Sequence, residues 1–193
     1  SNYTSSNSSF VKTWYDQIGS NNFIQSNNAS QPKIVSSGSV ITLNNKPTIS
    51  FGTQNDYWYL ESNSNFFSLT PSPISIFGVW KITDYSNSNA GVFGPSDYFG
   101  KGIEILQIST ISRRTALRLN GDGNVGGNWG MRNDNSGDAY QLWDNSTHTL
   151  NSFLFKSDSV SVYKNTTAVS LTNGSGISSL TSVQKYALGR YAS

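Results

Sequence analysis

The first tight turn of the chain is written Trp14-Tyr15-Asp16-Gln17-Ile18-Gly19-Ser20-Asn21-Asn22. The apolar run Phe10–Trp14 leads into it and is typical of a strand. Glycine and asparagine tolerate the left-handed backbone angles that tight turns require. This stretch therefore predicts that the chain begins as extended segments connected by short polar turns.

Two further stretches continue the same pattern, Gln31-Pro32-Lys33-Ile34-Val35 and Asn45-Lys46-Pro47-Thr48-Ile49-Ser50-Phe51. Each proline stands where a new extended segment starts, so it removes no hydrogen bond from a strand interior. The three stretches together resemble the opening of laminin-G-like domains of bacterial and phage proteins, which belong to the concanavalin-A-like lectin and glucanase jelly rolls. Val160–Asn165 is similar to a hairpin of that family, and Gln184–Arg190 is similar to one of its late strands.

The rest of the chain fits an all-β protein. No window of the sequence shows the apolar spacing of an amphipathic helix, whereas short apolar runs alternate with polar turns. We expect a two-sheet antiparallel β-sandwich of the jelly-roll type with very little helix. The most continuous apolar run, Ile74–Trp80, predicts a central strand that is buried on both faces. Further strands are expected over 38–43, 47–51, 57–61, 90–94, 102–108, 115–119, 148–155, 159–163 and 168–171.

The domain organisation expected is a single domain over 10–193 after a flexible, Ser- and Asn-rich lead-in at residues 1–9. Members of the resembled family continue past the Gly-Arg pair into a closing strand, and longer members have strands before the first turn. Their lack here predicts unpaired sheet edges. We expect that a longer polypeptide, residues 1–9 or a partner chain supplies the missing pairing.

Composition excludes several functional classes. Only 12% of the residues are charged and the formal net charge is +2, which is too small to indicate a nucleic-acid partner. The sequence has no cysteine, so thiol chemistry and thiolate metal sites are excluded. No apolar run approaches the ~20 residues of a membrane span.

Glycoside hydrolysis needs two carboxyl groups about 5–9.5 Å apart. The chain has two glutamates, Glu61 and Glu104. The setting of Glu104 resembles the nucleophile strand of arabinofuranosidase B catalytic domains, distant relatives within the same fold. That resemblance also implies an acidic residue after Gly189-Arg190, and none is present. Glu104 is therefore a weak candidate, and an outward-facing strand glutamate is the favoured interpretation.

Metal binding would involve calcium, because calcium takes oxygen ligands and turns rich in Asp and Asn supply them. The resembled family binds calcium at loops of this sort. The first candidate site is Asp16, Asn21 and Asn22 in the opening turn. A second is the long polar loop that contains Asp122, Asp134 and Asp138. The favoured alternative is that these residues are turn formers.

Glycan binding is the leading functional hypothesis. Aromatic rings pack on the C–H faces of sugars, and amides and carboxylates bond to the hydroxyl groups. We expect a non-catalytic glycan-binding or adhesion module of an extracellular, cell-surface or virion protein, such as a phage tail fibre. Two alternatives stay open: an assembly domain that pairs with neighbouring chains, and a degenerate glycoside hydrolase. The candidate ligand-binding residues are Trp58, Tyr98, Trp129, Trp143 and Asn133.

Overall fold

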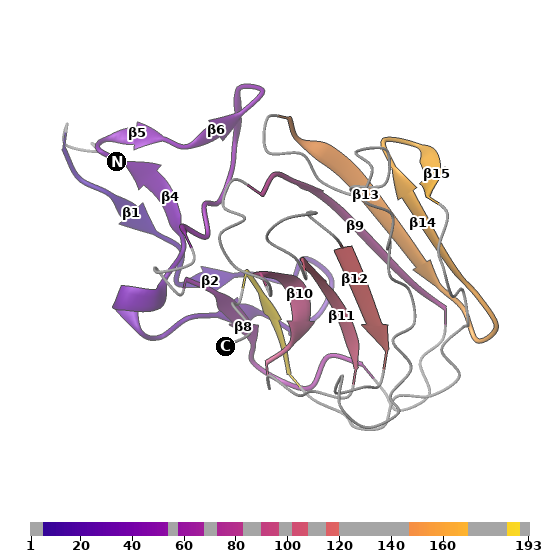
Figure 1. The fold of residues 1–193 in the computed structure, drawn as a ribbon. Helices are drawn as coiled ribbons and strands as arrows, with labels where there is room; N and C mark the ends of the chain where they lie inside the picture. The colour runs from indigo at the N-terminus through magenta and orange to yellow at the C-terminus, as the bar shows by residue number, and fades with distance from the viewer. Residues whose placement is uncertain are drawn as a thin grey trace.

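The structure is a computed structural model that describes residues 6–53, 58–67, 73–82, 90–96, 102–107, 115–119, 147–169 and 185–189. These residues form antiparallel sheets and one short 3₁₀ helix, η1 (Asn28–Ser30) (Figure 1). The predicted all-β, antiparallel class is thus confirmed. Among the described residues, no helix is long and apolar enough to cross a membrane.

The larger of the two main sheets has seven strands in the order β12-β11-β10-β16-β8-β3-β2. β16 lies between β10 and β8, so it joins the two halves of this sheet. The bounds are β2 Thr13–Trp14, β3 Phe23–Ile24, β8 Leu60–Ser62, β10 Ala90–Pro95, β11 Ile103–Gln107, β12 Thr115–Leu119 and β16 Tyr186–Leu188.

The second main sheet has four strands in the order β15-β14-β13-β9, and two small sheets accompany the pair. The bounds are β9 Ile74–Trp80, β13 Thr149–Phe155, β14 Val160–Lys164 and β15 Thr167–Val169. The small sheets are β1-β4-β5 and β6-β7, with bounds β1 Ser9–Phe10, β4 Lys33–Ser36, β5 Ser39–Val40, β6 Thr42–Leu43 and β7 Lys46–Pro47.

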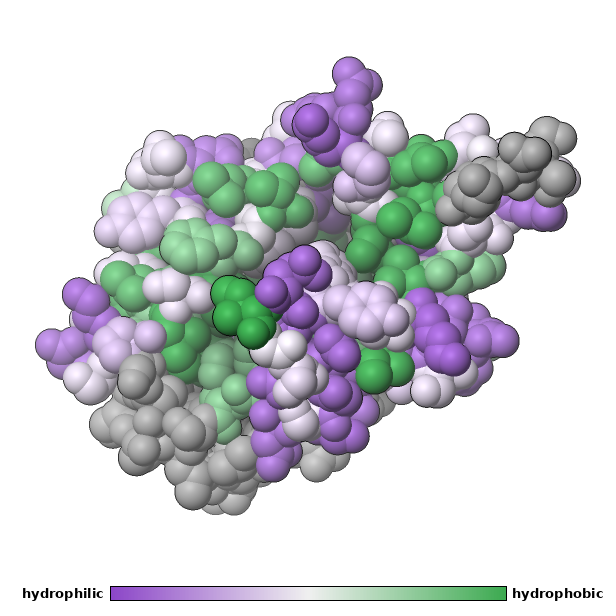
Figure 2. Space-filling model, turned by 180° about the vertical axis from the view of Figure 1, so that it is seen from behind, coloured by the Kyte–Doolittle hydropathy of each residue, from purple (hydrophilic) through white to green (hydrophobic). Residues whose placement is uncertain are grey.

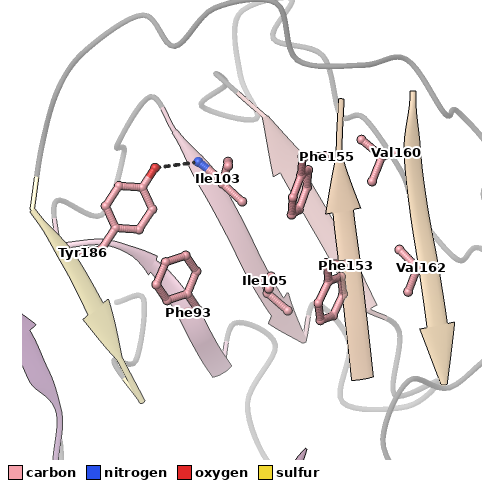
Figure 3. Packing of buried hydrophobic residues seen from close by; sticks show 8 residues of the cluster. All are labelled: Phe93, Ile103, Ile105, Phe153, Phe155, Val160, Val162 and Tyr186. Carbon is pink, nitrogen blue, oxygen red and sulfur yellow. Dashed lines mark hydrogen bonds between the residues drawn. The ribbon is translucent and has the colours of Figure 1, made fainter. Parts of the chain in front are cut away.

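The hydrophobic core lies between the two main sheets, which identifies the architecture as a sandwich (Figure 3). Each strand contributes alternate side chains to this core, because every second residue of a strand points to the same face of its sheet. On β13 the buried Phe153 and Phe155 alternate with the half-buried Leu154, as the sequence predicted. Figure 3 shows them, with Val160 and Val162 of β14, opposite residues of the larger sheet: Phe93, Ile103, Ile105 and Tyr186.

β9 corrects one expectation. Its apolar run predicted a central strand buried on both faces, but it is the end strand of the four-stranded sheet as the described residues define it. Only alternate residues face the core, and Phe77 and Val79 point outward with 70% and 56% of their surface exposed. Gly78 interrupts the run for a steric reason. A Cβ atom there would overlap the indole of Trp80, which stacks on Phe153 with a ring separation of 6.1 Å.

The two predicted polar turns adopt the backbone that tight hairpins require. Between β6 and β7, Asn44 and Asn45 have φ angles of 47° and 60°. Between β14 and β15, Asn165 and Thr166 have φ angles of 47° and 74°. Two successive residues with positive φ characterise the type I′ turn, whose twist matches that of the flanking strands. Asparagine tolerates this geometry better than most residues, which explains its position in both turns.

Several predicted boundaries moved. The run Phe10–Trp14 is divided between β1 and β2, and the strand expected over 57–61 is observed at Leu60–Ser62. Two residues of the expected lead-in take part in the fold, since Ser9 pairs with Val35 and the Asn7 carbonyl accepts a hydrogen bond from the Gly38 amide.

Tyr186 is the largest fully buried side chain among the described residues, and its hydroxyl group connects two strands of the larger sheet. The ring stacks on Phe93 with a centroid separation of 5.0 Å, and the hydroxyl oxygen accepts a 2.9 Å hydrogen bond from the Ile103 amide (Figure 3). The Tyr186 amide in turn donates to the Ser62 hydroxyl at 2.9 Å. Tyr186 therefore ties β16 to β11 and β8 from inside the core.

Replacing Tyr186 with phenylalanine should lower the free energy of unfolding by about 1–3 kcal/mol, because the buried Ile103 amide loses its acceptor. Urea unfolding followed by fluorescence measures this change. The exposed Tyr15 provides the control, and Tyr15→Phe should leave the midpoint unchanged. Equal stability of Tyr186→Phe and the wild type would show that this hydrogen bond does not stabilise the fold.

Alkaline pH should unfold the protein through the same residue. Burial raises the pKa of Tyr186 to about 12, from about 10 in an unfolded chain. The charge of Glu104 adds to the increase, and the bond from Ile103 opposes it. A raised pKa favours the folded state fully below pH ~10, and this contribution of roughly 3 kcal/mol disappears as the pH rises to about 12. Unfolding free energies measured from pH 8 to 12 should fall more steeply for the wild type than for Tyr186→Phe.

Candidate functional site

Trp58 lies in a cluster with one aromatic and one basic residue. Its ring meets Phe10 of β1 edge-on, with ring centroids 6.2 Å apart and an interplanar angle of 88°. The ammonium nitrogen of Lys33 of β4 lies 5.0 Å from the centroid of the Trp58 ring and 5.7 Å from that of Phe10. Such cation–π contacts are worth about 0.5–1 kcal/mol near the surface. β1 and β4 pair in register at Phe10 and Lys33, which explains how the three residues meet.

The backbone next to Trp58 is fixed by hydrogen bonds from buried polar groups. The Tyr59 amide donates to the Ser30 carbonyl of η1 at 3.0 Å, and the Gln25 side-chain amide donates to the Tyr59 carbonyl at 3.4 Å. Gln31 in turn donates to the Gln25 carbonyl at 2.9 Å. Gln25 and Gln31 are both buried, so Trp58 projects from a fixed support rather than from a free loop.

More aromatic surface is exposed in the residues that follow Phe10 along the chain. Phe10 is 44% exposed, and Trp14 and Tyr15 at the end of β2 are 48% and 65% exposed. β1 and β2 are end strands of their sheets, so no neighbouring strand covers their outer side in the described part of the chain. We call Phe10, Trp14, Tyr15 and Trp58, together with Lys33, the aromatic edge.

Asp16 organises the opening turn that follows the aromatic edge. Its carboxylate accepts hydrogen bonds from the Ile18 amide at 2.9 Å and the Asn21 amide at 3.2 Å. The Asp16 amide donates to the Asn22 side-chain oxygen at 2.9 Å. Hydrogen bonds from the backbone amides, that of Ile18 above all, hold the pKa of Asp16 below its ordinary value.

The three residues of the first predicted calcium site are thus brought together, and the structure gives their polar atoms partners within the protein. Asp16 and Asn22 bond to the turn itself, and the Asn21 side chain accepts from the Ser64 hydroxyl. These bonds are those of turn-forming residues. Among the described residues there is no group of three or more His, Cys, Asp or Glu side chains placed to hold a metal ion.

Glu104 lies on the face of β11 that points away from the core, because its neighbours Ile103 and Ile105 are fully buried between the sheets. Its cross-strand neighbours are Arg118 of β12 and Gly94 of β10. Glu61 lies three strands away in the same sheet, at a backbone separation of about 14 Å, and its carboxylate faces the Lys185 ammonium at 3.9 Å. Register therefore does not pair the two glutamates, which favours the non-catalytic interpretation.

The other predicted site residues, Tyr98, Trp129, Asn133 and Trp143, lie outside the described residues, as do Asp122, Asp134 and Asp138. The sequence analysis missed Phe10 and Lys33, because β1–β4 pairing and the position of Trp58 bring them together. One signal was available, since Phe10, Lys12 and Trp14 occupy alternate positions, and all three are exposed while Val11 and Thr13 are half-buried.

Comparison of the chain with protein-family models, with curated proteins and with solved structures gave no significant match.

The carboxyl group of Asp16 should titrate below the ordinary value of about 3.9, because protonation weakens its bonds to the backbone amides. A lowered pKa means that the turn is stabilised above pH ~4 and loses this support as the pH falls through the folded-state pKa. NMR titration of the carboxyl carbon measures the midpoint. Amide exchange at Ile18 and Asn21 should accelerate in Asp16→Ala, and a midpoint at or above 3.9 would contradict the assignment.

Proposed function

We propose that the chain is a non-catalytic glycan-binding module of an extracellular, cell-surface or virion protein, and that the aromatic edge is its binding surface. The observation that carries this proposal is the exposure of Phe10, Trp14 and Tyr15, together with the contact of Trp58 with Lys33 and Phe10. The sequence features shared with laminin-G-like jelly rolls agree with such a role, although fold alone does not decide function.

Stacking explains why the exposed rings suit a sugar. One face of a sugar ring presents C–H groups, which pack on an aromatic ring, while its hydroxyl groups remain free for hydrogen bonds. Phe10 offers such a ring, because 44% of its surface is exposed even though Trp58 and Lys33 contact it. The fixed backbone at Tyr59 supports Trp58 before any ligand binds, which lowers the entropy cost of binding.

Polar groups next to the aromatic edge can bond to hydroxyl or carboxylate groups of a bound glycan. The Lys33 ammonium lies against both rings and donates hydrogen bonds but accepts none. The opening turn that follows Trp14 and Tyr15 adds exposed amide groups, including the side chain of Gln17. A surface of this composition favours glycans over apolar ligands.

The test is a glycan array probed with the labelled full chain, with and without calcium. Trp58→Ala should bind about tenfold more weakly to the glycans that bind the wild-type chain, because an aromatic contact contributes about 0.5–1.5 kcal/mol beyond the area it buries. Lys33→Gln should reduce binding most for acidic glycans. The control is Ile18→Ala in the neighbouring turn, where the side chain is fully exposed and should not contribute.

Two results would contradict the proposal. One is an array on which the wild-type chain retains no glycan. The other is equal binding by the wild type and by Trp58→Ala, when urea unfolding shows that both proteins are folded. Binding that needs calcium in the wild type and is lost in Asp16→Ala would add a metal ion to the opening turn.

A further inference from the structure

The outer face of the four-stranded sheet carries large apolar side chains that are exposed in the described part of the structure. Phe77 and Val79 of β9, Leu150 of β13 and Tyr163 of β14 are all exposed there. Figure 2 shows hydrophobic residues at the surface on its left side, where the half-turn places β13 and β14. The opposite face of the same strands packs into the core, so the backbone that carries these side chains is held in place.

Strand register arranges these residues in rows. Phe77 pairs with Ser152, and Ser152 pairs with Tyr163, so two rings flank a serine in one row across three strands. Neighbouring strands lie about 4.8 Å apart, which places the Phe77 and Tyr163 backbones about 10 Å from each other. Val79 and Leu150 pair in the next exposed row. We call these five residues the flat face.

The flat face is uncharged. The outward positions of β9, β13, β14 and β15 hold only apolar residues and serines, which besides the flat face are Ser75, Leu154, Ser161 and Ala168. Charged or titratable groups occur at or beyond the strand ends. Lys81, His148 and Lys164, the last residue of β14, lie at one end of the sheet, and Lys156 and Asp158 lie at the other. Burial lowers the pKa of His148, and the charge of Lys81 lowers it further. Both effects favour the neutral imidazole.

The size of the flat face decides between a second protein chain and a smaller ligand. The four strands have 7, 7, 5 and 3 residues, and at about 3.3 Å of length and 4.8 Å of width for each residue they cover roughly 350 Å². A typical stable protein interface buries about 800 Å² on each partner. The face therefore provides about half of what a stable dimer needs, whereas exposed apolar patches of ~300–600 Å² on monomers are often functional.

We propose that the flat face binds an extended, uncharged polysaccharide chain. In an extended β-linked chain alternate sugar units present like faces, so rings two strands apart can stack on two units while Ser152 between them bonds to a hydroxyl group. The lack of charge on the outward positions matches a neutral ligand and would disfavour an acidic one. This site is separate from the aromatic edge, and either can exist without the other.

Retention of the full chain by insoluble neutral polysaccharides, microcrystalline cellulose and chitin, tests the proposal, with a calcium pectate gel as the acidic comparison. The wild type should be depleted from solution by at least one neutral polymer, equally at low and high salt, because neutral contacts are not screened. Phe77→Ala and Tyr163→Ala should each weaken retention about tenfold. Val40→Ala, an exposed apolar residue of β5, is the matched control and should bind as the wild type does.

Ser152→Glu provides a variant that keeps both rings and adds a charge between them, so it should abolish retention. Trp58→Ala should leave retention unchanged while it lowers binding on the glycan array, which separates the two sites. Several results would overturn the proposal: no retention of the wild type, retention that Phe77→Ala and Tyr163→Ala leave intact, or selective retention by the pectate gel. Sedimentation that shows a dimer lost on Phe77→Ala would also overturn it, because a second copy would then cover the face.

Discussion

The fold depends on aromatic packing between the two main sheets. Phe93 and Tyr186 from the seven-stranded sheet and Phe153 and Phe155 from the four-stranded sheet are buried in one cluster. Full burial of a large apolar side chain is worth about 1.5–3 kcal/mol, so this cluster outweighs any pairwise polar interaction described in the chain. Few charged residues are available to add to it, since they make up 12% of the sequence.

The low charge content also shapes the surface. A sheet with one face in the core usually presents polar residues on the other face, but β9 and β13 present Phe77, Val79 and Leu150. Where such residues are exposed on rigid strands, they offer contact area without a large ordering cost. Both proposed sites follow this principle: the aromatic edge lies at the ends of two sheets, and the flat face lies on the outside of one.

Sequence periodicity predicted those elements whose order is local. Alternation and turn chemistry predicted strands over 115–119, 148–155 and 159–163 and a turn at Asn165. The structure has these strands at Thr115–Leu119, Thr149–Phe155 and Val160–Lys164, with the turn between β14 and β15. Periodicity could not assign places within a sheet. The apolar run of β9 predicted a central strand, because such a run has the same sequence pattern whether its second face is covered by protein or exposed to solvent. The aromatic edge was missed for a similar reason, since Phe10 and Lys33 meet only through the β1–β4 pairing.

The position of β16 has a consequence for how the protein is made. It is the last of the described strands in sequence, yet it lies between β10 and β8 near the middle of the seven-stranded sheet. Until residues 186–188 have left the ribosome, the two halves of that sheet have no strand to join them, and each exposes a bare edge. The pairing of β8 and β10 with β16 can therefore form only late in synthesis, and unpaired strand edges of this kind are prone to aggregate.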